Sequence, residues 1–452
     1  MPGVDGDLPH ELGGSEPVWN ASCRRKTEAR PQRLNTWFNL IPVAEYEGTR
    51  PDEVLFLDSF VTIEPKAEGK RNGSNGTGRS PYRVLFEGKR EMCVVVEIGV
   101  IFVWYGEDLA KPDRPFPKLY DEIYPSKYMT SKAVVFQNTH VMDFVENGSD
   151  NLHFRVVHLW EYSKMYDHEI TEETITLKQD TKFRYGSCSN RRLVRLMSRV
   201  LPKLELNHDY AYHGPGLAVV GAEGSGSPRM HALVSLTPEG PNRTRVYVTV
   251  ALDPTTFPEW AERPFQTLFP KHALCDLLAG IMANYIKNEF DVDAMIWRNR
   301  KYLRRPTLLP VEKHLGDVIR WGETFYPKDF SPPSEETKPP EEMRWEFLDD
   351  VENIKQGVVH PYNVAGEELI AFKGEDGNIR IFDAYCPHQG AHLGHGGMLK
   401  NDSVRCPFHG FFFDSEGRCI GPNVENRTRF ISNLNLGRIR QKIEGGRVEV
   451  FV

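Results

Sequence analysis

Two short cysteine–histidine motifs near the carboxyl end constrain the fold of this chain more than any other feature. Cys386-Pro-His388 and Cys406-Pro-Phe-His409 are separated by seventeen residues, and several glycines surround them. Two thiolates and two imidazoles can hold a [2Fe–2S] cluster, in which the thiolates bind one iron and the imidazoles the other. Glycine allows the backbone to approach the sulfides and donate N–H bonds to them. The motifs therefore predict two loops that meet around such a cluster.

Zinc is the alternative ion, because it also accepts two cysteines and two histidines. Its usual patterns combine C-x2-C with H-x3-H, whereas this chain has C-x-H and C-x2-H, so the spacing favours the cluster. Cys419 lies beyond the motif and is expected to be a core cysteine. His392 and His395 lie in the first loop. We expect them on the surface or behind the ligands, not as ligands.

A proline-rich acidic stretch, SPPSEETKPPEEM over Ser331–Met343, divides the chain. It predicts a semi-extended linker between a long part, residues 33–330, and a compact part, residues 344–452. Residues 1–32 are rich in glycine, proline and charge without a period, and predict a disordered tail. Lys66–Ser80 is expected to be a flexible loop.

The long part changes pattern along its length. Residues 131–253 are mostly strand-like, for example at Glu169–Leu177, at His231–Leu236 and in the alternating Arg245–Leu252. Pro264–Tyr302 then places apolar residues three and four apart, as in a helix. The pattern predicts an α+β fold with an antiparallel sheet wrapped on a long C-terminal helix.

The compact part consists of short strand-like runs and turns. Glu368–Phe372 and Ile379–Phe382 flank the turn sequence EDGN, which predicts a hairpin. We therefore expect residues 344–452 to form a small all-β domain.

Composition excludes several classes of protein. The 452 residues, 40% hydrophobic and 26% charged, suit two or three globular domains. A formal charge of −7 does not favour nucleic-acid binding. No apolar run reaches the ~18–20 residues that span a bilayer, and no signal peptide is visible. Seven scattered cysteines fit a reducing compartment, so a soluble cytoplasmic protein is expected.

A second candidate metal site lies upstream. Asn147, Asp150 and His153 recur every third residue, which places them on one face of a helix. His158 falls off that face, and it can reach the same metal only if the helix ends or bulges. Two histidines and a carboxylate are the ligands of a mononuclear ferrous site, which leaves positions open for dioxygen.

The carboxylate ligand of this site is expected from a distant part of the chain. Asp293, at the end of the predicted long helix, is the best candidate, and Glu289 and Asp291 are rivals. Each of these residues alone is more typical of a solvated helix face or a cap.

Together these motifs resemble the Rieske non-haem iron oxygenases. Residues 344–452 resemble a Rieske domain. The N-x-x-D-x-x-H-x4-H run from Asn147 to His158, with the later D-x-x-I-W that starts at Asp293, resembles the catalytic domain. The resemblance implies a helix-grip (START/Bet v 1-like) catalytic domain that binds mononuclear Fe(II).

The resemblance also assigns roles. It implies that His153, His158 and Asp293 bind iron and that Cys386, His388, Cys406 and His409 bind the cluster. Asp150, counted with Asn147 as catalytic, would bridge a cluster histidine and an iron histidine. A carboxylate bonded to both imidazoles would orient them and shorten the electron path.

The chain departs from the family pattern in two ways. In most members the Rieske domain precedes the catalytic domain, whereas here it follows. Trp37–Gly106, including the strand-like Ile98–Gly106, resembles the flanks of a family N-terminus but has no cluster ligands. Permutation of the chain and loss of an ancestral loop both explain this.

Where respiratory Rieske proteins have two further cysteines, this chain has Ala391 and Phe408. The segment therefore resembles the lower-potential oxygenase type.

The run E-N-G-x-D-x-x-H and Gly214-Pro-Gly-Leu217 are similar to the branch with sterol 7-desaturases and ketosteroid 9α-hydroxylases. This implies O2-dependent hydroxylation, desaturation or oxidative demethylation of a hydrophobic, sterol-like substrate. Gly214–Gly216 fits a bend in a strand equally well. His208 and His213 are expected to be ordinary sheet residues, although one of them could bond a substrate oxygen.

No dinucleotide-binding fingerprint follows a strand. Electrons are therefore expected from a separate NAD(P)H-dependent reductase, directly or through a ferredoxin, and the family resemblance implies a homotrimer. Two alternatives stay open. One is an oxygenase for a smaller substrate, such as an aromatic acid or a quaternary amine. The other is a non-enzymatic Rieske electron carrier fused to a lipid-binding domain.

Overall fold

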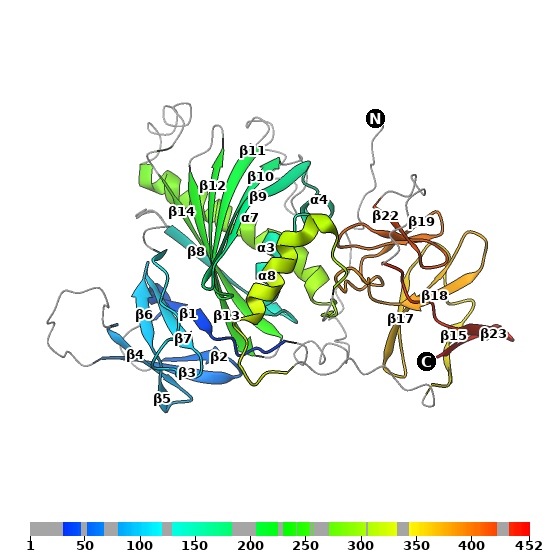
Figure 1. Ribbon diagram of the computed structural model, residues 1–452, viewed down its shortest axis with the longest axis horizontal. Coiled ribbons are helices and arrows are strands. Elements are labelled where there is room, and N and C mark those ends of the chain that lie inside the picture. The colour runs from blue at the N-terminus through cyan, green and yellow to red at the C-terminus, as the bar shows by residue number, and fades with distance from the viewer. Residues whose placement is uncertain are drawn as a thin grey trace.

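The computed structural model describes twelve segments of the chain: residues 30–46, 52–66, 80–119, 129–182, 205–224, 229–240, 242–253, 256, 271–303, 306–331, 343–422 and 434–452. They form a mixed, mostly β structure with few helices (Figure 1). Small sheets at the amino end (blue) lie beside a large sheet with its helices (green), and a strand-rich carboxyl-terminal part (orange to red) lies on the other side of the helices.

The large sheet has seven antiparallel strands in the order β8-β14-β13-β12-β11-β10-β9. Their bounds are β8 Met129–Gln137, β9 Tyr162–Ile170, β10 Thr174–Lys182, β11 Glu205–His213, β12 Leu217–Gly224, β13 Met230–Gly240 and β14 Arg243–Leu252. Every residue of β13 is buried, because other elements cover both faces of this strand. β9 forms one edge of the sheet.

Helices cover one side of this sheet. α7, Lys271–Trp297, packs along β8 and β14, and α8, Lys313–Glu323, packs on α3, Val141–Ser149. The short α4, His153–Val156, and the 3-10 turn η4, Pro310–Glu312, complete this layer. Among the described residues, no helix is long and apolar enough to cross a bilayer.

The amino-terminal segment forms two small sheets and a 3-10 turn. One sheet has the order β1-β7-β6 and the other β2-β3-β4-β5. The elements are β1 Thr36–Pro42, η2 Val43–Glu45, β2 Asp52–Phe56, β3 Ser59–Pro65, β4 Tyr82–Phe86, β5 Arg90–Glu91, β6 Val94–Glu97 and β7 Val100–Tyr105. Trp37 of β1 packs edge-on against Trp104 of β7. The strand expected at Ile98–Gly106 is therefore β7, whose residues are all buried.

The carboxyl-terminal part contains three small sheets in the orders β15-β24-β23, β16-β17-β18 and β19-β20-β21-β22. Their strands are β15 Trp345–Asp350, β16 His360–Val364, β17 Glu367–Lys373, β18 Ile379–Asp383, β19 Met398–Lys400, β20 Ser403–Arg405, β21 Phe412–Phe413, β22 Cys419–Gly421, β23 Gln441–Glu444 and β24 Arg447–Phe451. The hairpin expected around EDGN is formed by β17 and β18.

The structure differs from the sequence expectations at two places. Glu169–Leu177 is not one strand: it contains the end of β9, a turn and the start of β10. Arg30–Gln32 were assigned to a disordered tail, yet Arg30 is buried and pairs with Glu146 at 2.5 Å. Most of the tail, the loop after Lys66 and the linker lie outside the described residues.

Close packing at Gly390 joins the carboxyl-terminal part to the end of α7. Gly390 has a φ of +74°, and its N–H donates to the Cys386 carbonyl within its own loop. A Cβ built at Gly390 would lie 1.9 Å from the carbonyl oxygen of Lys301. Lys301 N–H in turn donates to the Gly390 carbonyl at 2.8 Å. A side chain at residue 390 therefore cannot be accommodated without moving the backbone.

We expect Gly390→Ala to destabilise the docked carboxyl-terminal part. The left-handed backbone costs about 1–2 kcal/mol for alanine, and the clash adds about 1–3 kcal/mol. Gly357→Ala is the matched control, because Gly357 has a φ of +77° and nothing within 4 Å of its Cβ position. The measurement is denaturant unfolding of the iron-loaded protein, followed by visible circular dichroism. Equal losses of unfolding free energy in the two variants would contradict the clash.

Candidate cluster and iron site

Two equivalent loops carry the cysteine–histidine motifs. In the first loop, Cys386 N–H donates to the Ala391 carbonyl at 2.9 Å and Gly390 N–H donates back to Cys386 at 2.8 Å. In the second, Cys406 and Gly410 make the same two bonds, at 2.8 and 3.1 Å. Gly390 and Gly410 both have left-handed φ values, which only glycine adopts at low cost. The spacing of each motif thus produces the same turn twice.

These loops bring together the four buried side chains that the sequence predicts as cluster ligands. Cys386, His388, Cys406 and His409 are each at most 4% exposed. The Nδ1 atoms of the two histidines face each other at 3.0 Å. Each Nε2–H donates to a carboxylate at 2.7 Å: His409 to Asp150, and His388 to Glu312. When both Nε2 atoms are protonated, the two Nδ1 atoms carry lone pairs that face and repel each other. A cation bound between the two Nδ1 atoms removes this repulsion.

The thiols share this environment. Burial raises the pKa of Cys386 well above its usual range. Burial also acts to raise the pKa of Cys406, but the hydrogen bond with Cys386, the charge of His409 and nearby backbone N–H groups outweigh it and hold that pKa at about 6. The thiolate form of Cys406 is therefore favoured, and the thiolate is the form of cysteine that binds metal.

The upstream residues converge as a second donor set. His153, His158 and Asp293 are each at most 2% exposed. Asp293 Oδ1 lies 3.0 Å from His158 Nε2 and 3.8 Å from His153 Nε2. No hydrogen-bond partner of His153 Nε2 is found among the described residues. A buried imidazole nitrogen that faces a carboxylate across 3.8 Å fits an ion bound between the two atoms.

Hydrogen bonds behind these three side chains fix their orientation. His153 Nδ1–H donates to the Asp150 carbonyl at 2.6 Å, which leaves Nε2 free to bind a metal. Asn147 Nδ2 donates to Asp293 Oδ2 at 2.9 Å. Glu289 Oε2 lies 2.5 Å from His158 Nδ1, so this rival of Asp293 lies behind the ligand set. The other rival, Asp291, pairs with Lys287 instead.

The electrostatics differ between the two histidines. Burial lowers the pKa of His153 to about 4. Burial acts in the same direction on His158, but the carboxylates of Asp293 and Glu289 outweigh it and raise the pKa of His158 to about 10. The pKa of Asp150 lies below its usual range because His409 outweighs the effect of burial. The Asp150 carboxylate therefore remains charged between the two donor sets.

Asp150 connects the two donor sets within one chain. Its carboxylate accepts from His409 Nε2–H at 2.7 Å and from Gln389 Nε2–H at 3.0 Å, and its main-chain carbonyl accepts from His153. The expectation that the carboxylate bonds both imidazoles is therefore wrong in one detail. The cause is the chain path, since α3 ends at Ser149 and Asp150 caps it with extended backbone. A single helical face through His153 does not form.

Three buried residues that contact the donor sets were not found from the sequence. Glu312 binds His388 from η4, and Gln389 reaches both carboxylates, with Nε2 lying 3.4 Å from Glu312 Oε1. Arg300 donates to the Gln389 carbonyl at 2.8 Å and to Glu146 at 3.2 Å. All three are at most 5% exposed. No local spacing identifies them, because their partners lie far away in the chain.

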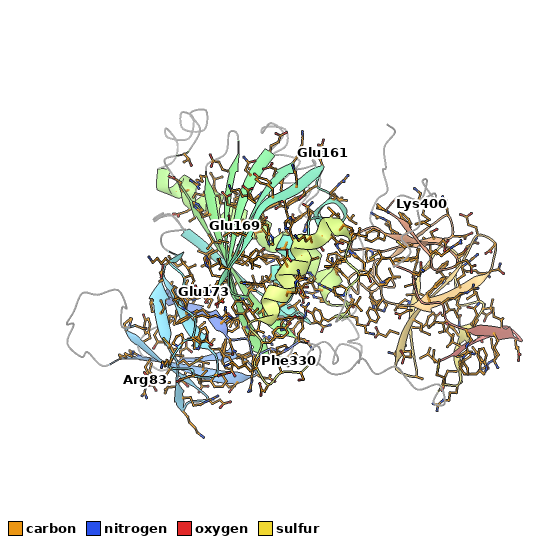
Figure 2. The ribbon with its side chains drawn as sticks, in the orientation of Figure 1. Arg83, Glu161, Glu169, Glu173, Phe330 and Lys400 are labelled. Carbon is orange, nitrogen blue, oxygen red and sulfur yellow. The ribbon has the colours of Figure 1, made fainter. Side chains whose placement is uncertain are left out.

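The remaining candidates have structural positions. His392 is buried, so a surface position is wrong for it, whereas His395 is exposed. Cys419 packs in the core of the carboxyl-terminal part, together with Ala391 and Phe408. Figure 2 shows side chains of this part meeting those of the large sheet and helices next to α4 and α8.

The stretch after β11 is a turn. His208 and His213 lie in β11, and Gly214–Gly216 connects it to β12. Cβ atoms at Gly214 and Gly216 would meet Thr36 Oγ1 at 2.3 Å and the Trp37 carbonyl at 2.2 Å. The glycines thus allow β1 to approach this turn, and the strand-bend interpretation accounts for them.

Comparisons with known proteins identify two domains in the chain. Residues 344–433 match the Rieske [2Fe-2S] domain, and residues 103–326 match the 3-ketosteroid 9alpha-hydroxylase C-terminal domain. A cholesterol 7-desaturase (nvd 1) of Ciona intestinalis is 42% identical over 76 residues, which is 17% of this chain and 16% of that protein. A 3-ketosteroid-9-alpha-monooxygenase oxygenase component of Mycolicibacterium smegmatis is 37% identical over 75 residues, 17% of this chain and 19% of that protein.

The chain thus spans between a sixth and a fifth of the length of these curated relatives. Among solved structures, dicamba monooxygenase bound to dicamba aligns with a TM-score of 0.40 at 13% identity, over 65% of this chain and 97% of that chain. The two matched regions place a 3-ketosteroid 9alpha-hydroxylase C-terminal domain ahead of a Rieske [2Fe-2S] domain in this chain.

Proposed function

We propose that this protein is a Rieske non-haem iron oxygenase that hydroxylates, desaturates or oxidatively demethylates a hydrophobic, sterol-like substrate. The observation that carries the proposal is the link through Asp150 between His409 and His153. It joins a cluster-type donor set to a second buried donor set of two histidines and a carboxylate. The names of the relatives, cholesterol 7-desaturase and 3-ketosteroid-9-alpha-monooxygenase, support the reaction and substrate class.

The donor sets fit the two metal groups of the family. Cys386, Cys406, His388 and His409 would hold the [2Fe–2S] cluster, and His153, His158 and Asp293 would hold ferrous iron. When bound, the cluster stores and supplies an electron, and ferrous iron activates dioxygen beside the substrate. A separate reductase, directly or through a ferredoxin, would supply the electrons.

The chain's own residues orient these donors. Asp150 accepts hydrogen bonds from both His409 and His153. It therefore holds His409 with Nδ1 toward the cluster loops and His153 with Nε2 toward Asp293. Asn147 holds the second oxygen of Asp293. Arg300, bonded to Gln389 and Glu146, ties the first loop to α3. Burial keeps water away from these bonds and strengthens them.

Incompletely covered apolar side chains support a hydrophobic substrate. Leu278, Met282, Ile286 and Phe290 lie four residues apart on α7 and pack against the main core while only partly buried. Sheet residues such as Met165, Tyr210 and Val220 are likewise partly buried against this core. The α7 stripe ends one turn before Asp293. An apolar ligand along this stripe would reach the proposed iron site.

The test is turnover of a panel of sterols and ketosteroids by the iron-loaded protein with a surrogate reductase and dioxygen, analysed by mass spectrometry. We expect an oxidised or dehydrogenated sterol product. Aromatic acids and quaternary amines in the same panel test the small-substrate oxygenase. About two irons per chain and no turnover with any substrate would instead indicate the electron carrier.

Replacing Asp150 tests the link itself. We expect Asp150→Asn to lower turnover about 10–100-fold, because an uncharged amide binds and orients His409 less strongly. Iron content and the cluster's visible spectrum should remain those of the parent. Asp349→Asn, which also removes a charged acceptor of the carboxyl-terminal part, is the matched control and should retain turnover. Unchanged turnover in Asp150→Asn would contradict the proposed link.

Several finer points belong to the same proposal. We propose a helix-grip fold for the catalytic domain, residues 33–330, with 331–343 as linker and 344–452 as the Rieske domain. α7 against β8 and β14 supports the helix-grip assignment. The family resemblance supports a homotrimer, and Cys93, which has no disulfide partner among the described residues, is compatible with a reducing, cytoplasmic location.

A further inference from the structure

We propose that His168, His314 and Asp317 form a third metal site, which binds a divalent transition ion of the zinc type. Among the described residues, three groups of His, Cys, Asp or Glu bring one ligand atom each to within 4.8 Å of the others. Two of these groups overlap the donor sets already described. The third is this cluster, which joins β9 to α8 and is separate from both.

The approach of the two imidazoles matches that of the two proposed cluster histidines. His168 Nδ1 lies 2.9 Å from His314 Nδ1, and the cluster histidines His388 and His409 face each other through the same atoms at 3.0 Å. A tetrahedral ion bound at about 2.0–2.1 Å would hold two such nitrogens about 3.3 Å apart. A small opening of the pair therefore suffices to admit the ion.

The backbone of β9 presents His168 to this site through a bulge. Tyr166 pairs with Lys178 and Glu169 with Thr176, so Asp167 and His168 together oppose one residue of β10. Asp167 takes a left-handed φ of 48° and is exposed. Strict alternation from Met165, which packs on the core, would place Asp167 on the core side. The extra residue places His168 there instead, facing α8.

α8 supplies the other two donors from one helix turn. His314 and Asp317 are three residues apart, so both side chains lie on the same face. Figure 1 shows α8 running in front of the large sheet, and Figure 2 labels Glu169, the neighbour of His168, on β9. His168 Nε2 is buried, and no hydrogen-bond partner for it is found among the described residues. Asp317 also pairs with the exposed Arg320, which a bound ion would have to displace from one oxygen.

The donor set selects the class of ion. Two imidazoles and one carboxylate suit zinc and its neighbours in the transition series, whereas magnesium and calcium prefer oxygen ligands. The cluster is half-buried rather than enclosed, so water can complete the coordination. This arrangement favours a structural or regulatory ion that clamps α8 to the edge strand β9.

An ion that clamps α8 to β9 would also affect the contact between Glu312 and the proposed cluster histidine His388. His314 lies two residues after Glu312, whose carboxylate binds His388 Nε2 at 2.7 Å. Fixing the start of α8 would therefore also fix η4 and Glu312 toward the first cluster loop. This consequence rests on the proposed function, but zinc binding itself does not.

The test uses the iron-loaded full-length protein and zinc ions. After equilibration with one to two equivalents of zinc and desalting, we expect about one zinc per chain, with the iron content unchanged. His168→Gln and His314→Gln should bind none, and Asp317→Asn should bind zinc roughly tenfold more weakly or worse. His360→Gln, which changes a half-buried histidine elsewhere, is the matched control and should bind as the parent does.

Thermal unfolding supplies a second readout. Zinc should raise the midpoint for the parent and for His360→Gln, but not for His168→Gln or His314→Gln. If zinc does not bind the parent, binds only while iron is lost, or binds the two histidine variants as tightly as the parent, the site is refuted. If one histidine variant fails to fold, the other and Asp317→Asn still decide the result. None of these readouts requires oxygenase activity.

Discussion

His153→Ala is expected to abolish turnover while leaving the cluster in place. His153 contributes a fully buried Nε2 that faces Asp293 and has no hydrogen-bond partner among the described residues. We expect turnover to fall by more than about 100-fold, beyond the 10–100-fold typical of removing an outer hydrogen-bond partner. Iron analysis should give about two irons per chain instead of about three. The visible and paramagnetic spectra of the cluster should be unchanged.

The control for this experiment is His360→Gln. His360 lies in β16 of the carboxyl-terminal part and accepts from Lys355 N–H, away from both donor sets. It should retain three irons and parental turnover. Full activity in His153→Ala would remove this residue from the site, and an unchanged iron count would remove it from the metal ligands.

Mixing two inactive variants should restore no turnover. One chain carries Cys386→Ser with Cys406→Ser and lacks the cluster; the other carries His153→Ala. Both carboxylates that hold the cluster histidines, Asp150 and Glu312, belong to the same chain as those histidines. Each chain therefore contains all the contacts between the cluster histidines and their carboxylates. Neither variant contains both a working cluster and a working iron site.

The alternative arrangement gives a clear signal. If the contacts were made between neighbours in a ring of three, about a quarter of all iron sites in an equal mixture would be intact and also lie next to a working cluster. Turnover near that fraction of the parent would contradict transfer within one chain. The two variants should be produced together with different tags and isolated by both, so that any mixed assembly is present in the assay. Parent chains mixed with doubly inactive chains provide the reference.

The sequence predicted those parts of the site that repeat a local pattern. Cys386-x-His388 and Cys406-x2-His409 each form a complete turn, and the glycine that closes each turn is four residues after the cysteine. Glu312 could not be predicted in this way. It is an ordinary acidic residue at the end of a 3-10 turn, and it becomes a partner of His388 only when two distant parts of the chain pack together.

The helix break was predicted too late in the chain. Helical spacing from Asn147 to His153 suggested one continuous face, with a break before His158. The structure ends α3 at Ser149, within Gly148-Ser149-Asp150-Asn151, a run of residues that favour turns. Turn propensity therefore overrides the three-residue spacing, and as a result the Asp150 carboxylate and carbonyl point to different histidines.

The direct contacts of Arg300, Glu312 and Asp150 with the cluster loops also bear on the reversed order of the two parts. Such contacts depend on complementary surfaces and not on which segment is synthesised first. A connecting peptide needs only to be long enough to let the surfaces meet. The two parts can therefore form the same interface whichever of them comes first in the chain.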